Sequence, residues 1–392
     1  MKDEWKLLPL SSVSSESKNI KWKDIAKDKQ YRYIDLTSVS REMKSITEPQ
    51  LINKDNAPSR AQRIIQTDDI LFATTRPTLR RFCIVPTAYD GQICSTGYCV
   101  IRPNKEEILP SWIFYLLSSD LFYDYIEPLQ TGATYPAVTD TDVRGYLAPI
   151  PSLAEQQRIV DILDEAFEKI DALKANAEQN LQDAKALFQA ALRKELKPKD
   201  GWVRKPFTDI CEITSSLVDP RIDEYRSLLH IGGANIESET GVLFDLKTAE
   251  EEGLTSGKFT FDSSMVLYNK IRPYLKKVAR PNFSGLCSAD MYPLSPLKGT
   301  SRDFLYYLLL SDDFTKYAVE GSPRTGMPKV NRACLFAYKC YVPSENEQRS
   351  IASRLDDLND RCKALQTNYD KTLTLCDDLK QALLRKAFNG EL

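Results

Sequence analysis

The sequence has few of the residues that build metal sites and disulfide frameworks. His230 is the only histidine, and the nine cysteines are odd in number and contain no Cys-x-x-Cys spacing. This argues against a structural zinc site or a disulfide framework, so we expect reduced thiols. No apolar run approaches the roughly eighteen residues of a membrane span. The start, Met-Lys-Asp-Glu-Trp, also lacks the apolar region of a secretory signal, so we expect a cytoplasmic protein.

Motifs of catalysis are also missing. Enzymes that methylate adenine flip the base out of the duplex and hold it with an Asn/Asp-Pro-Pro-aromatic loop, which does not occur here. The segment 253–258 (Gly-Leu-Thr-Ser-Gly-Lys) resembles a phosphate loop, but it has three intervening residues where four are needed, and no Ser or Thr follows. We interpret it as a turn, and His230, in a strand-like run without nearby ligands, as structural. We expect no catalytic residue, metal or cofactor in this chain.

What the sequence does contain is an internal repeat. Residues of the first half recur in the second at a separation of 197 near the start and 192 later on. The recurring residues are Trp5 and Trp202, Ile34 and Ile231, Arg76-Pro77 and Arg272-Pro273, and Pro136 and Pro328. With 392 residues, the chain is long enough for two copies that each bury a core of their own.

A long helix is predicted at the end of each copy. Ser152 with Glu155, and Ser344 with Glu347, have the spacing of a capping box at a helix start. Behind each box, apolar or small residues follow in alternating steps of four and three, the period of a coiled-coil seam. The predicted seam positions are Ile159, Leu163, Ala166, Ile170, Leu173, Ala177, Asn180, Ala184, Leu187 and Ala191, and Ile351, Leu355, Leu358, Cys362, Leu365, Tyr369, Thr372, Cys376, Leu379 and Leu383.

The rest of each copy reads as α+β. Strand-like runs lie at 32–36, 69–73, 228–231 and 265–269, and one helix is expected at 110–126 and at 301–319. We therefore predict two α+β domains, residues 1–150 and 201–342, related by a pseudo-twofold axis. Spacer helices within 151–200 and 343–392 would join them as a long antiparallel two-helix coiled coil. Separate packing of each helix on its own domain is the alternative.

The formal net charge of -2 hides two basic islands at equivalent places in the repeat. Residues 70–89 and 263–289 contain no acid but several Arg and Lys side chains, which can neutralise phosphates or hold a guanine edge. A hydroxyl-rich loop follows each island. The candidate DNA-binding residues are Thr74, Thr75, Arg76, Arg80, Arg81, Thr131, Thr134 and Tyr135 in the first copy, and Asn269, Lys270, Arg272, Tyr274, Lys276, Lys277, Arg324, Thr325 and Lys329 in the second.

For any single basic residue, a solvated surface charge is the alternative. The sequence also leaves open which residues read bases and which position phosphates.

The two helix starts carry a specific resemblance. Segments 151–158 (Pro-Ser-Leu-Ala-Glu-Gln-Gln-Arg) and 343–349 (Pro-Ser-Glu-Asn-Glu-Gln-Arg), the Gly-Ala-Thr-Tyr-Pro loop at 132–136 and the end Phe-Asn-Gly-Glu-Leu at 388–392 resemble the specificity subunit of type I restriction–modification systems. The resemblance covers essentially the whole chain. The first helix departs from the pattern because it ends Leu-Arg-Lys-Glu-Leu at 192–196, without Phe-Asn-Gly.

This resemblance implies that each domain is a target-recognition domain that reads one half of a split sequence in double-stranded DNA. It also implies docking of two methyltransferase subunits, which use S-adenosylmethionine. Where the system also cuts DNA, two restriction subunits that use ATP and Mg²⁺ would join. The chain itself would be non-catalytic and would bind none of these cofactors.

Two readers on a shared spacer should address half-sites about one helical turn, roughly 10 bp, apart. Because the copies diverge outside the anchors, we expect an asymmetric bipartite target. A duplicated coiled-coil scaffold that joins two protein-binding domains is the main alternative, although it leaves the matched basic islands unexplained. An enzyme with a hidden site, such as a nuclease, is a weaker alternative.

Overall fold

The computed structural model describes residues 5–322 and 326–392. The chain divides into two compact units. The first unit consists of residues 1–178 and 370–392, and the second of residues 179–369, so both long helices contribute residues to both units.

The first unit is built from two small sheets and a ribbon. One sheet is antiparallel and has the order β2 (Ser14–Ser15), β9 (Tyr98–Pro103), β6 (Ile70–Ala73) and β7 (Phe82–Ile84). The other has the order β4 (Gln50–Ile52), β3 (Tyr31–Ile34), β8 (Ile93–Ser95) and β5 (Ala61–Ile64), with β3 parallel to β8. β1 (Lys6–Pro9) and β10 (Leu147–Ile150) form the antiparallel ribbon. The helices are α1 (Pro110–Ser118), α2 (Asp120–Ile126) and α3 (Asp140–Arg144), with short 3₁₀ helices η1 (Leu10–Ser12), η2 (Trp22–Asp24), η3 (Pro77–Leu79), η4 (Thr87–Tyr89) and η5 (Glu127–Leu129).

The second unit repeats this topology. Its antiparallel sheet has the order β12 (Cys211–Glu212), β20 (Met291–Pro296), β17 (Val266–Asn269) and β18 (Val278–Ala279). Its mixed sheet has the order β13 (Leu217–Val218), β16 (Lys258–Phe261), β19 (Gly285–Ser288), β14 (Leu229–Ile231) and β15 (Lys247–Thr248), with β14 parallel to β19. The ribbon pairs β11 (Val203–Pro206) with β21 (Lys339–Val342). The helices are α5 (Asp223–Arg226), α6 (Arg302–Leu310), α7 (Asp312–Glu320) and α8 (Arg332–Ala337), with 3₁₀ helices η6 (Phe207–Asp209), η7 (Gly233–Asn235) and η8 (Pro273–Leu275).

The central strand of each antiparallel sheet is covered on both faces. In the first unit, Ile70 and Phe72 of β6 contact a core shared with α1, α2 and the long helices, whereas Leu71 and Ala73 face a second core against the mixed sheet. This alternation follows from the two-residue period of a strand. The predicted strands at 32–36, 69–73, 228–231 and 265–269 are confirmed within one or two residues, and so is the α+β class.

The single helix predicted in each copy is wrong, because the structure breaks it at a serine. Ser119 separates α1 from α2, and Ser311 separates α6 from α7, both with extended backbone. The Ser311 hydroxyl donates to the carbonyl of Leu308 (2.7 Å) and accepts from the N–H of Phe314 (3.2 Å), so it ends one helix and caps the next. Serine readily offers such side-chain bonds in place of the helical ones.

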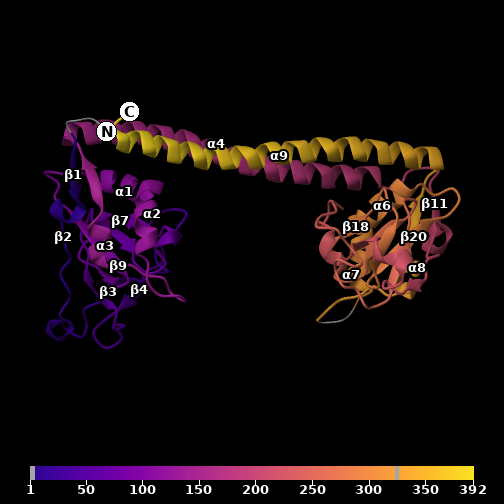
Figure 1. The fold of residues 1–392 in the computed structure, drawn as a ribbon, viewed down its shortest axis with the longest axis horizontal. Coiled ribbons are helices and arrows are strands. Elements are labelled where there is room, and N and C mark those ends of the chain that lie inside the picture. Colours follow the sequence, from indigo (N-terminus) through magenta and orange to yellow (C-terminus); the bar gives the residue numbers. More distant parts are fainter. Residues whose placement is uncertain (1–4, 323–325) are drawn as a thin grey trace. The chain divides into compact units, whose positions relative to one another are not determined.

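The long helices α4 (Leu153–Glu195) and α9 (Glu345–Asn389) lie side by side in each unit (Figure 1). In the first unit, Lys174 pairs with Asp377 (2.8 Å) and Lys380 with Asp171; in the second, Arg354 pairs with Glu195 (2.6 Å). As the residue number increases along α4, the number of its partner in α9 decreases, which confirms the predicted antiparallel pairing. Within the described part of the chain, no helix is both long and apolar enough for a membrane crossing.

The predicted seam is right at the helix starts, where Ile159 and Ile351 are buried, and at one position of each later heptad, whereas the other position is exposed at several leucines. Leu163, Ile170, Ala177 and Ala184 are buried as predicted, but Leu173 and Leu187 are 56% and 52% exposed, and Leu365 and Leu379 of α9 are 41% and 48% exposed. The contact face instead follows residues that are buried or half-buried, Leu163, Phe167, Ile170, Lys174, Ala177, Leu181, Ala184 and Phe188 in α4, and Leu355, Asn359, Cys362, Gln366, Tyr369, Leu373, Cys376 and Lys380 in α9.

The helices are turned by one residue because they also pack on the globular parts. Phe167 contacts the ring of Tyr115 (centroids 5.3 Å apart), and Phe188 contacts Tyr307 (6.4 Å). Burying the rings of Phe167 and Phe188 removes more apolar surface from water than burying their neighbours Ala166 and Leu187 would, which favours this orientation.

A buried glutamine ties the start of each long helix to its globular part. Gln156 and Gln348 are fully buried. The Gln348 amide accepts from the N–H of Ser301 (2.7 Å) and donates to the carbonyls of Gly299 (3.0 Å) and Pro343 (2.9 Å). Gln156 makes the same three bonds, with Leu109, Glu107 and Pro151. Two of the three bonds satisfy the loop before α1 or α6, and the third satisfies the proline before the long helix, which gives the glutamine of both motifs a structural role.

In each predicted capping box, the serine hydroxyl accepts the expected hydrogen bond from the backbone three residues later. The Ser152 hydroxyl accepts from the N–H of Glu155 (3.3 Å), and Ser344 accepts from Glu347 (3.4 Å). The Glu347 carboxylate also accepts from the indole N–H of Trp202 (3.1 Å), one of the residues that mark the repeat.

Replacing Gln348 with leucine should loosen the second unit where α9 begins. The change leaves one N–H and two carbonyls without this partner, and each unsatisfied buried group costs about 1–3 kcal/mol. We expect the thermal midpoint to fall and hydrogen exchange to accelerate over residues 299–310 and 343–355. Gln157→Leu is the control, because Gln157 is exposed and its amide donates to the neighbouring carboxylate of Asp161 (2.7 Å) on the same helix. Equal effects of the two substitutions would show that the buried amide is unimportant.

Candidate nucleic-acid interface

Both basic islands contain the same unusual turn. Arg76 and Arg80 flank η3 with φ of 51° and 52°, and Arg272 and Lys276 flank η8 with φ of 52° and 45°. Left-handed backbone is uncommon outside glycine and costs energy, so it persists only where the surroundings hold it. Its occurrence at equivalent places in both units marks the turn as a functional candidate.

The hydroxyl-rich second loop holds this turn in place. The N–H of Arg76 donates to the carbonyl of Pro136 (2.6 Å), and the N–H of Arg272 donates to that of Pro328 (2.8 Å). Thr75 also forms a bridge with Ala137, and Ile271 forms one with Lys329. The two segments that the sequence proposed separately therefore form one surface in each unit.

Four of the predicted residues use their charge inside the unit. Arg80 pairs with Asp120 (2.6 Å) and Lys276 with Asp312 (2.6 Å), each the first residue of a helix. The hydrogen bond from Lys276 is the main reason that the pKa of Asp312 lies below its usual value.

The next residue of each island, Arg81 or Lys277, also forms a hydrogen bond within its own unit. Arg81 donates to the carbonyl of Leu36, and Lys277 donates to that of Gly233 (2.5 Å). These bonds explain why basic residues recur here, and a DNA contact by any of the four stays a prediction.

Three further candidates are buried. The Thr74 hydroxyl donates to the carbonyl of Gly97 (3.0 Å), and the Asn269 amide donates to that of Ile271 (3.2 Å). The Lys270 ammonium lies 4.9 Å from the centre of the Tyr292 ring and donates to the carbonyl of Ala289. Burial, with the nearby charge of Lys329, lowers the pKa of Lys270.

The remaining described candidates are accessible from outside. In the first unit, the Arg76 guanidinium lies 4.9 Å from the centre of the Tyr135 ring and donates to the carbonyl of Thr134 (3.3 Å). Tyr135 is 67% exposed, and Thr131 lies beside it in the same loop. In the second unit, Arg272, Tyr274 and Lys329 are exposed. Arg324 and Thr325 lie outside the described residues.

Asp290 is a charged neighbour of the second island that the acid-free pattern of the sequence does not reveal. The acid-free island ends at residue 289, but β17 pairs with β20 so that Asn269 lies opposite Met291, which brings Asp290 next to Lys270. Its carboxylate lies 3.5 Å from the ammonium of Lys329 and 3.9 Å from that of Lys270. Recognising the strand pair in advance would have revealed this neighbour.

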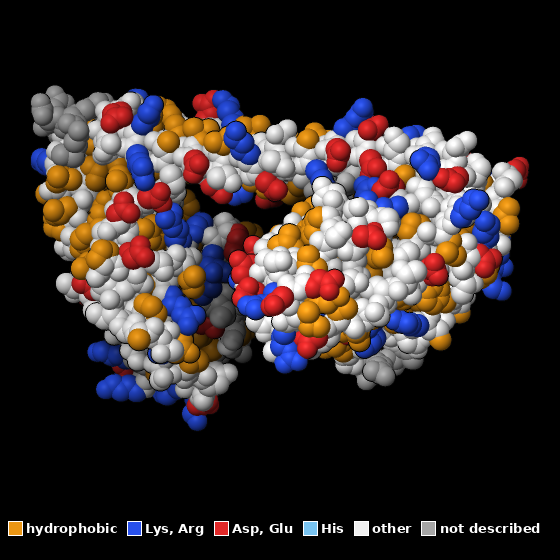
Figure 2. Space-filling view, turned by 45° about the vertical axis from the view of Figure 1, so that its right-hand side comes forward, with side chains coloured by type: hydrophobic (Ala, Val, Ile, Leu, Met, Phe, Trp, Pro, Cys, Tyr) orange, Lys and Arg blue, Asp and Glu red, His pale blue; other side chains and the backbone are white. Residues whose placement is uncertain are grey.

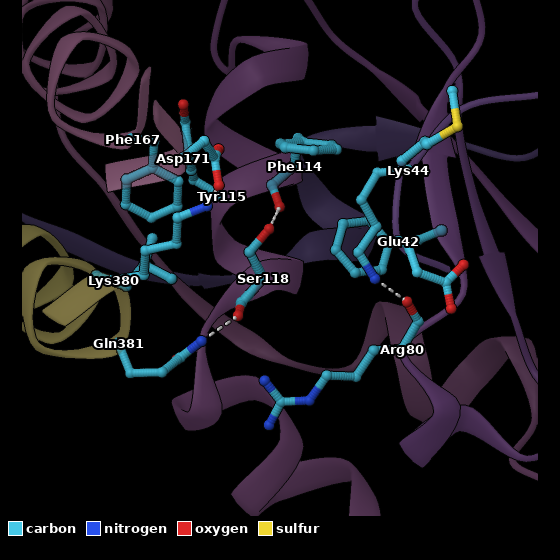
Figure 3. Close-up of a pocket in the computed structure, with 13 residues that line it drawn as sticks. Glu42, Lys44, Arg80, Phe114, Tyr115, Ser118, Phe167, Asp171, Lys380 and Gln381 are labelled. Atoms are coloured by element: carbon cyan, nitrogen blue, oxygen red, sulfur yellow. Dashed lines mark hydrogen bonds and ion pairs between the residues drawn. The ribbon is translucent and has the colours of Figure 1, made fainter. Parts of the chain in front are cut away.

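A different cavity, of about 410 Å³, lies in the first unit between the hairpin at 42–44, α1 and the long helices (Figure 3). Lys44 reaches into it and donates to the carbonyl of Arg80, and burial with the nearby charge of Arg80 lowers its pKa to about 8. Gln381 of α9 donates to the carbonyl of Ser118 (3.1 Å) at the end of α1. The cavity thus lies where the globular part meets the helices.

The equivalent place in the second unit contains two large side chains, Tyr306 and Arg280. There the Tyr306 hydroxyl donates to the carbonyl of Thr240 (2.9 Å), and the Arg280 guanidinium lies 4.5 Å from the centre of the same ring. Arg280 also pairs with Asp303 (2.7 Å) and with Asp356 of α9. Around this place, the two units therefore contact the long helices partly through different side chains, Lys380 and Gln381 in the first unit and Arg280 in the second.

Among the residues described, no group of three or more His, Cys, Asp or Glu side chains could hold a metal ion. His230 is buried and its Nδ1 lies 3.0 Å from the carboxylate of Glu252, and burial lowers its pKa. This agrees with the structural role expected of it.

Comparison with known proteins connects this geometry to one family. The family model described as the type I restriction modification DNA specificity domain matches residues 2–182 and again residues 199–375. The specificity subunit of the type I restriction enzyme EcoDI of Escherichia coli is 30% identical over 295 residues, which cover 67% of this chain and 66% of that protein, slightly less than two thirds of its length. The HindI specificity subunit of Haemophilus influenzae is 31% identical over 144 residues, or 36% of this chain and 31% of that protein.

Two solved structures are similar over the whole chain. One, from work on complex assembly and conformational transition of the type I restriction–modification system, has a TM-score of 0.87 at 27% identity and covers 100% of this chain and 99% of its own. The HsdS subunit of Thermoanaerobacter tengcongensis has a TM-score of 0.66 at 27% identity, with 100% and 98% covered. These matches confirm the resemblance that the two helix starts indicated. The chain belongs to the family of type I restriction–modification DNA specificity domains, and it carries that domain twice.

Proposed function

We propose that this chain is the DNA-reading subunit of a type I restriction–modification complex and that each unit reads one half of an asymmetric bipartite site. The observation that carries the proposal is the left-handed turn that presents Arg76 in one unit and Arg272 in the other. Each turn rests on the proline carbonyl of the second loop, and each arginine is exposed, whereas the cation four residues later, Arg80 or Lys276, is paired with an aspartate of its own unit. Exposed arginines on a rigid support suit contacts to phosphates or guanine edges.

The exposed neighbours of the two arginines differ, which supports two different half-sites. Arg76 is stacked on Tyr135, whereas the residue equivalent to Tyr135 is Met327, which is 55% exposed beside Arg272. Tyr274 and Asp290 have no equivalents of the same chemistry in the first unit, where Thr78 and Gly97 occupy their places.

The long helices offer a surface for partner subunits. Leu173 of α4 and Leu379 of α9 are exposed in the first unit, and their equivalents, Leu365 and Leu187, are exposed in the second. The antiparallel pairing puts the two leucines of each unit at the same level of the helix pair. Figure 2 shows exposed apolar side chains along the long helices among the charged ones. Paired exposed leucines offer an apolar contact on which a helix of a partner could dock.

We propose that two methyltransferase subunits dock on these pairs, one for each unit, and that they bring S-adenosylmethionine. Restriction subunits, where present, would bring ATP and Mg²⁺, and this chain would bind none of these cofactors. Methylating and guarding chromosomal DNA would place the complex in the cytoplasm.

Mapping methylation in cells tests the function directly. This chain is co-expressed with the methyltransferase subunit encoded beside it, and adenine methylation is mapped by single-molecule sequencing. We expect a split motif with two different halves that appears only when both proteins are present. The same methylation with and without this chain would refute the proposal and favour a scaffold role.

Arg76→Ala and Arg272→Ala should weaken DNA binding by the purified complex without unfolding it. Where an arginine contacts a phosphate, the slope of log affinity against log salt should fall by about one. Fluorescence anisotropy at several salt concentrations measures both effects. Arg361→Ala is the control, because Arg361 is exposed on α9 away from the turn. Binding by both variants that matches the control would exclude the two turns as the DNA-contacting surface.

Charges in the exposed leucine pairs should remove the methyltransferase subunits one at a time. We expect Leu173→Lys with Leu379→Lys to leave one partner per chain, and the further changes Leu187→Lys and Leu365→Lys to leave none. Native mass spectrometry of the co-expressed complex counts the subunits. Ala175→Lys is the control, since Ala175 is exposed and lies about 200° further around the helix than Leu173. Two partners retained in all variants would place docking elsewhere.

A further inference from the structure

The second unit has a cavity of about 360 Å³ next to its left-handed turn. Its wall includes Gly233, Asn269, Arg272, Lys277, Ser288 and Asp290. Arg272 and Lys277 come from the turn, Ser288 and Asp290 from the end of β19 and the loop behind it, and Gly233 from the loop behind β14. Donors and an acceptor of hydrogen bonds therefore face one space at the surface that we propose to face DNA.

In the first unit, the equivalent side chains differ. The N–H of Lys270 donates to the carbonyl of Asp290 (3.1 Å), and the N–H of Thr74 donates to that of Gly97 (2.9 Å), so Gly97 holds the place of Asp290. Leu36 holds the place of Gly233, and a Cβ on Gly97 would lie 3.3 Å from its side chain. The first unit thus puts a leucine against a glycine where the second unit has an open wall and a carboxylate.

When the second unit binds DNA, the carboxylate of Asp290 is unfavourable unless the DNA offers it a hydrogen-bond donor. Its side chain is 57% exposed, in an island otherwise free of acids, and DNA phosphates would repel it. Lys329 at 3.5 Å and Lys270 at 3.9 Å offset part of this repulsion. Both distances exceed the roughly 2.7–2.9 Å of a charge-assisted hydrogen bond, so these lysines do not saturate the carboxylate oxygens.

A base edge provides a suitable partner. In the major groove, cytosine N4 donates a hydrogen bond, and carboxylates accept it, while guanine O6 and N7 accept from arginine. Asp290 and Arg272 line the same cavity and offer this complementary pair of groups. Contacts to phosphate alone would need only the cations.

We propose that Asp290 is a specificity-determining residue of the second unit, which with Arg272 reads one G·C base pair of its half-site by accepting a hydrogen bond from the cytosine amino group. This inference rests on the proposed DNA-reading function. The first unit, with Gly97 in this place, reads its half-site without a carboxylate.

The test uses the full chain, co-expressed with its methyltransferase subunit, and single-molecule methylation mapping. In Asp290→Asn and Asp290→Ala, we expect one G·C position in one half-site to become degenerate, with discrimination reduced about 5- to 150-fold. The other half-site and the spacing should not change. Asp290→Glu, which keeps the carboxylate, should retain the preference for G·C, and Asp313→Asn, an exposed acid on α7 of the same unit, should leave the whole motif unchanged.

An unchanged motif in the Asn and Ala variants would overturn the inference, and so would a uniform loss of methylation at every site, which is expected if Asp290 only orders Lys270 and Lys329. Binding of the purified variant complexes to duplexes that carry each base pair at that position separates lost discrimination from lost folding. Failure of the wild-type chain to direct any split motif would refute the proposed function itself, whatever Asp290 does.

Discussion

Two equivalent aspartates join the turn that presents the exposed arginine to the end of a long helix. Asp312 accepts from Lys276 at 2.6 Å and from Arg193 of α4 at 3.1 Å. Asp120 pairs in the same way with Arg80 at 2.6 Å and with Arg385 of α9 at 3.7 Å. Each aspartate is also the first residue of the helix that follows the serine break, where a negative charge suits the helix dipole.

This arrangement supports the strained backbone of the turn. Lys276 keeps a left-handed conformation while its ammonium is held by Asp312, and the arginine that reaches outward lies four residues earlier in the same turn. The lowered pKa of Asp312 shows that its carboxylate is stabilised in the charged form. Surface ion pairs are worth little by themselves, but here a largely buried lysine of the turn and an arginine of α4 share one carboxylate within that unit.

The sequence was sufficient for the repeat, the fold class, the strands and the antiparallel helices, because each leaves a periodic or recurring pattern. It was insufficient where two patterns compete. Ala166 and Phe167 are neighbours, so the apolar steps of α4 fit two registers, and the aromatic contact with Tyr115 decides between them. The serines that break the predicted helices look like ordinary surface residues until their hydrogen bonds to the preceding turn are known.

The basic islands could be recognised in the sequence, but which of their cations pair with an acid inside the protein could not. Arg80 finds its acid 40 residues further along the chain, and Lys276 finds its acid 36 residues further, so sequence proximity could not separate the tied cations from Arg76 and Arg272. Asp290 shows the opposite error, since an island defined by the absence of acids ends one residue before a carboxylate that folds back into it.

The divergence of the two units follows from which groups hold the scaffold. The turn is fixed by a backbone N–H on a proline carbonyl and by a shared aspartate, and each helix start by a buried glutamine that bonds mainly to backbone. Bonds to the backbone place no demand on the side chains around them. The first unit therefore has Leu36 and Gly97 where the second has Gly233 and Asp290, while the same backbone bonds hold the turn and the helix start in both. A scaffold held in this way can change what it presents to a ligand while its attachment to the long helices stays the same, and such freedom is what a pair of readers for two different half-sites requires.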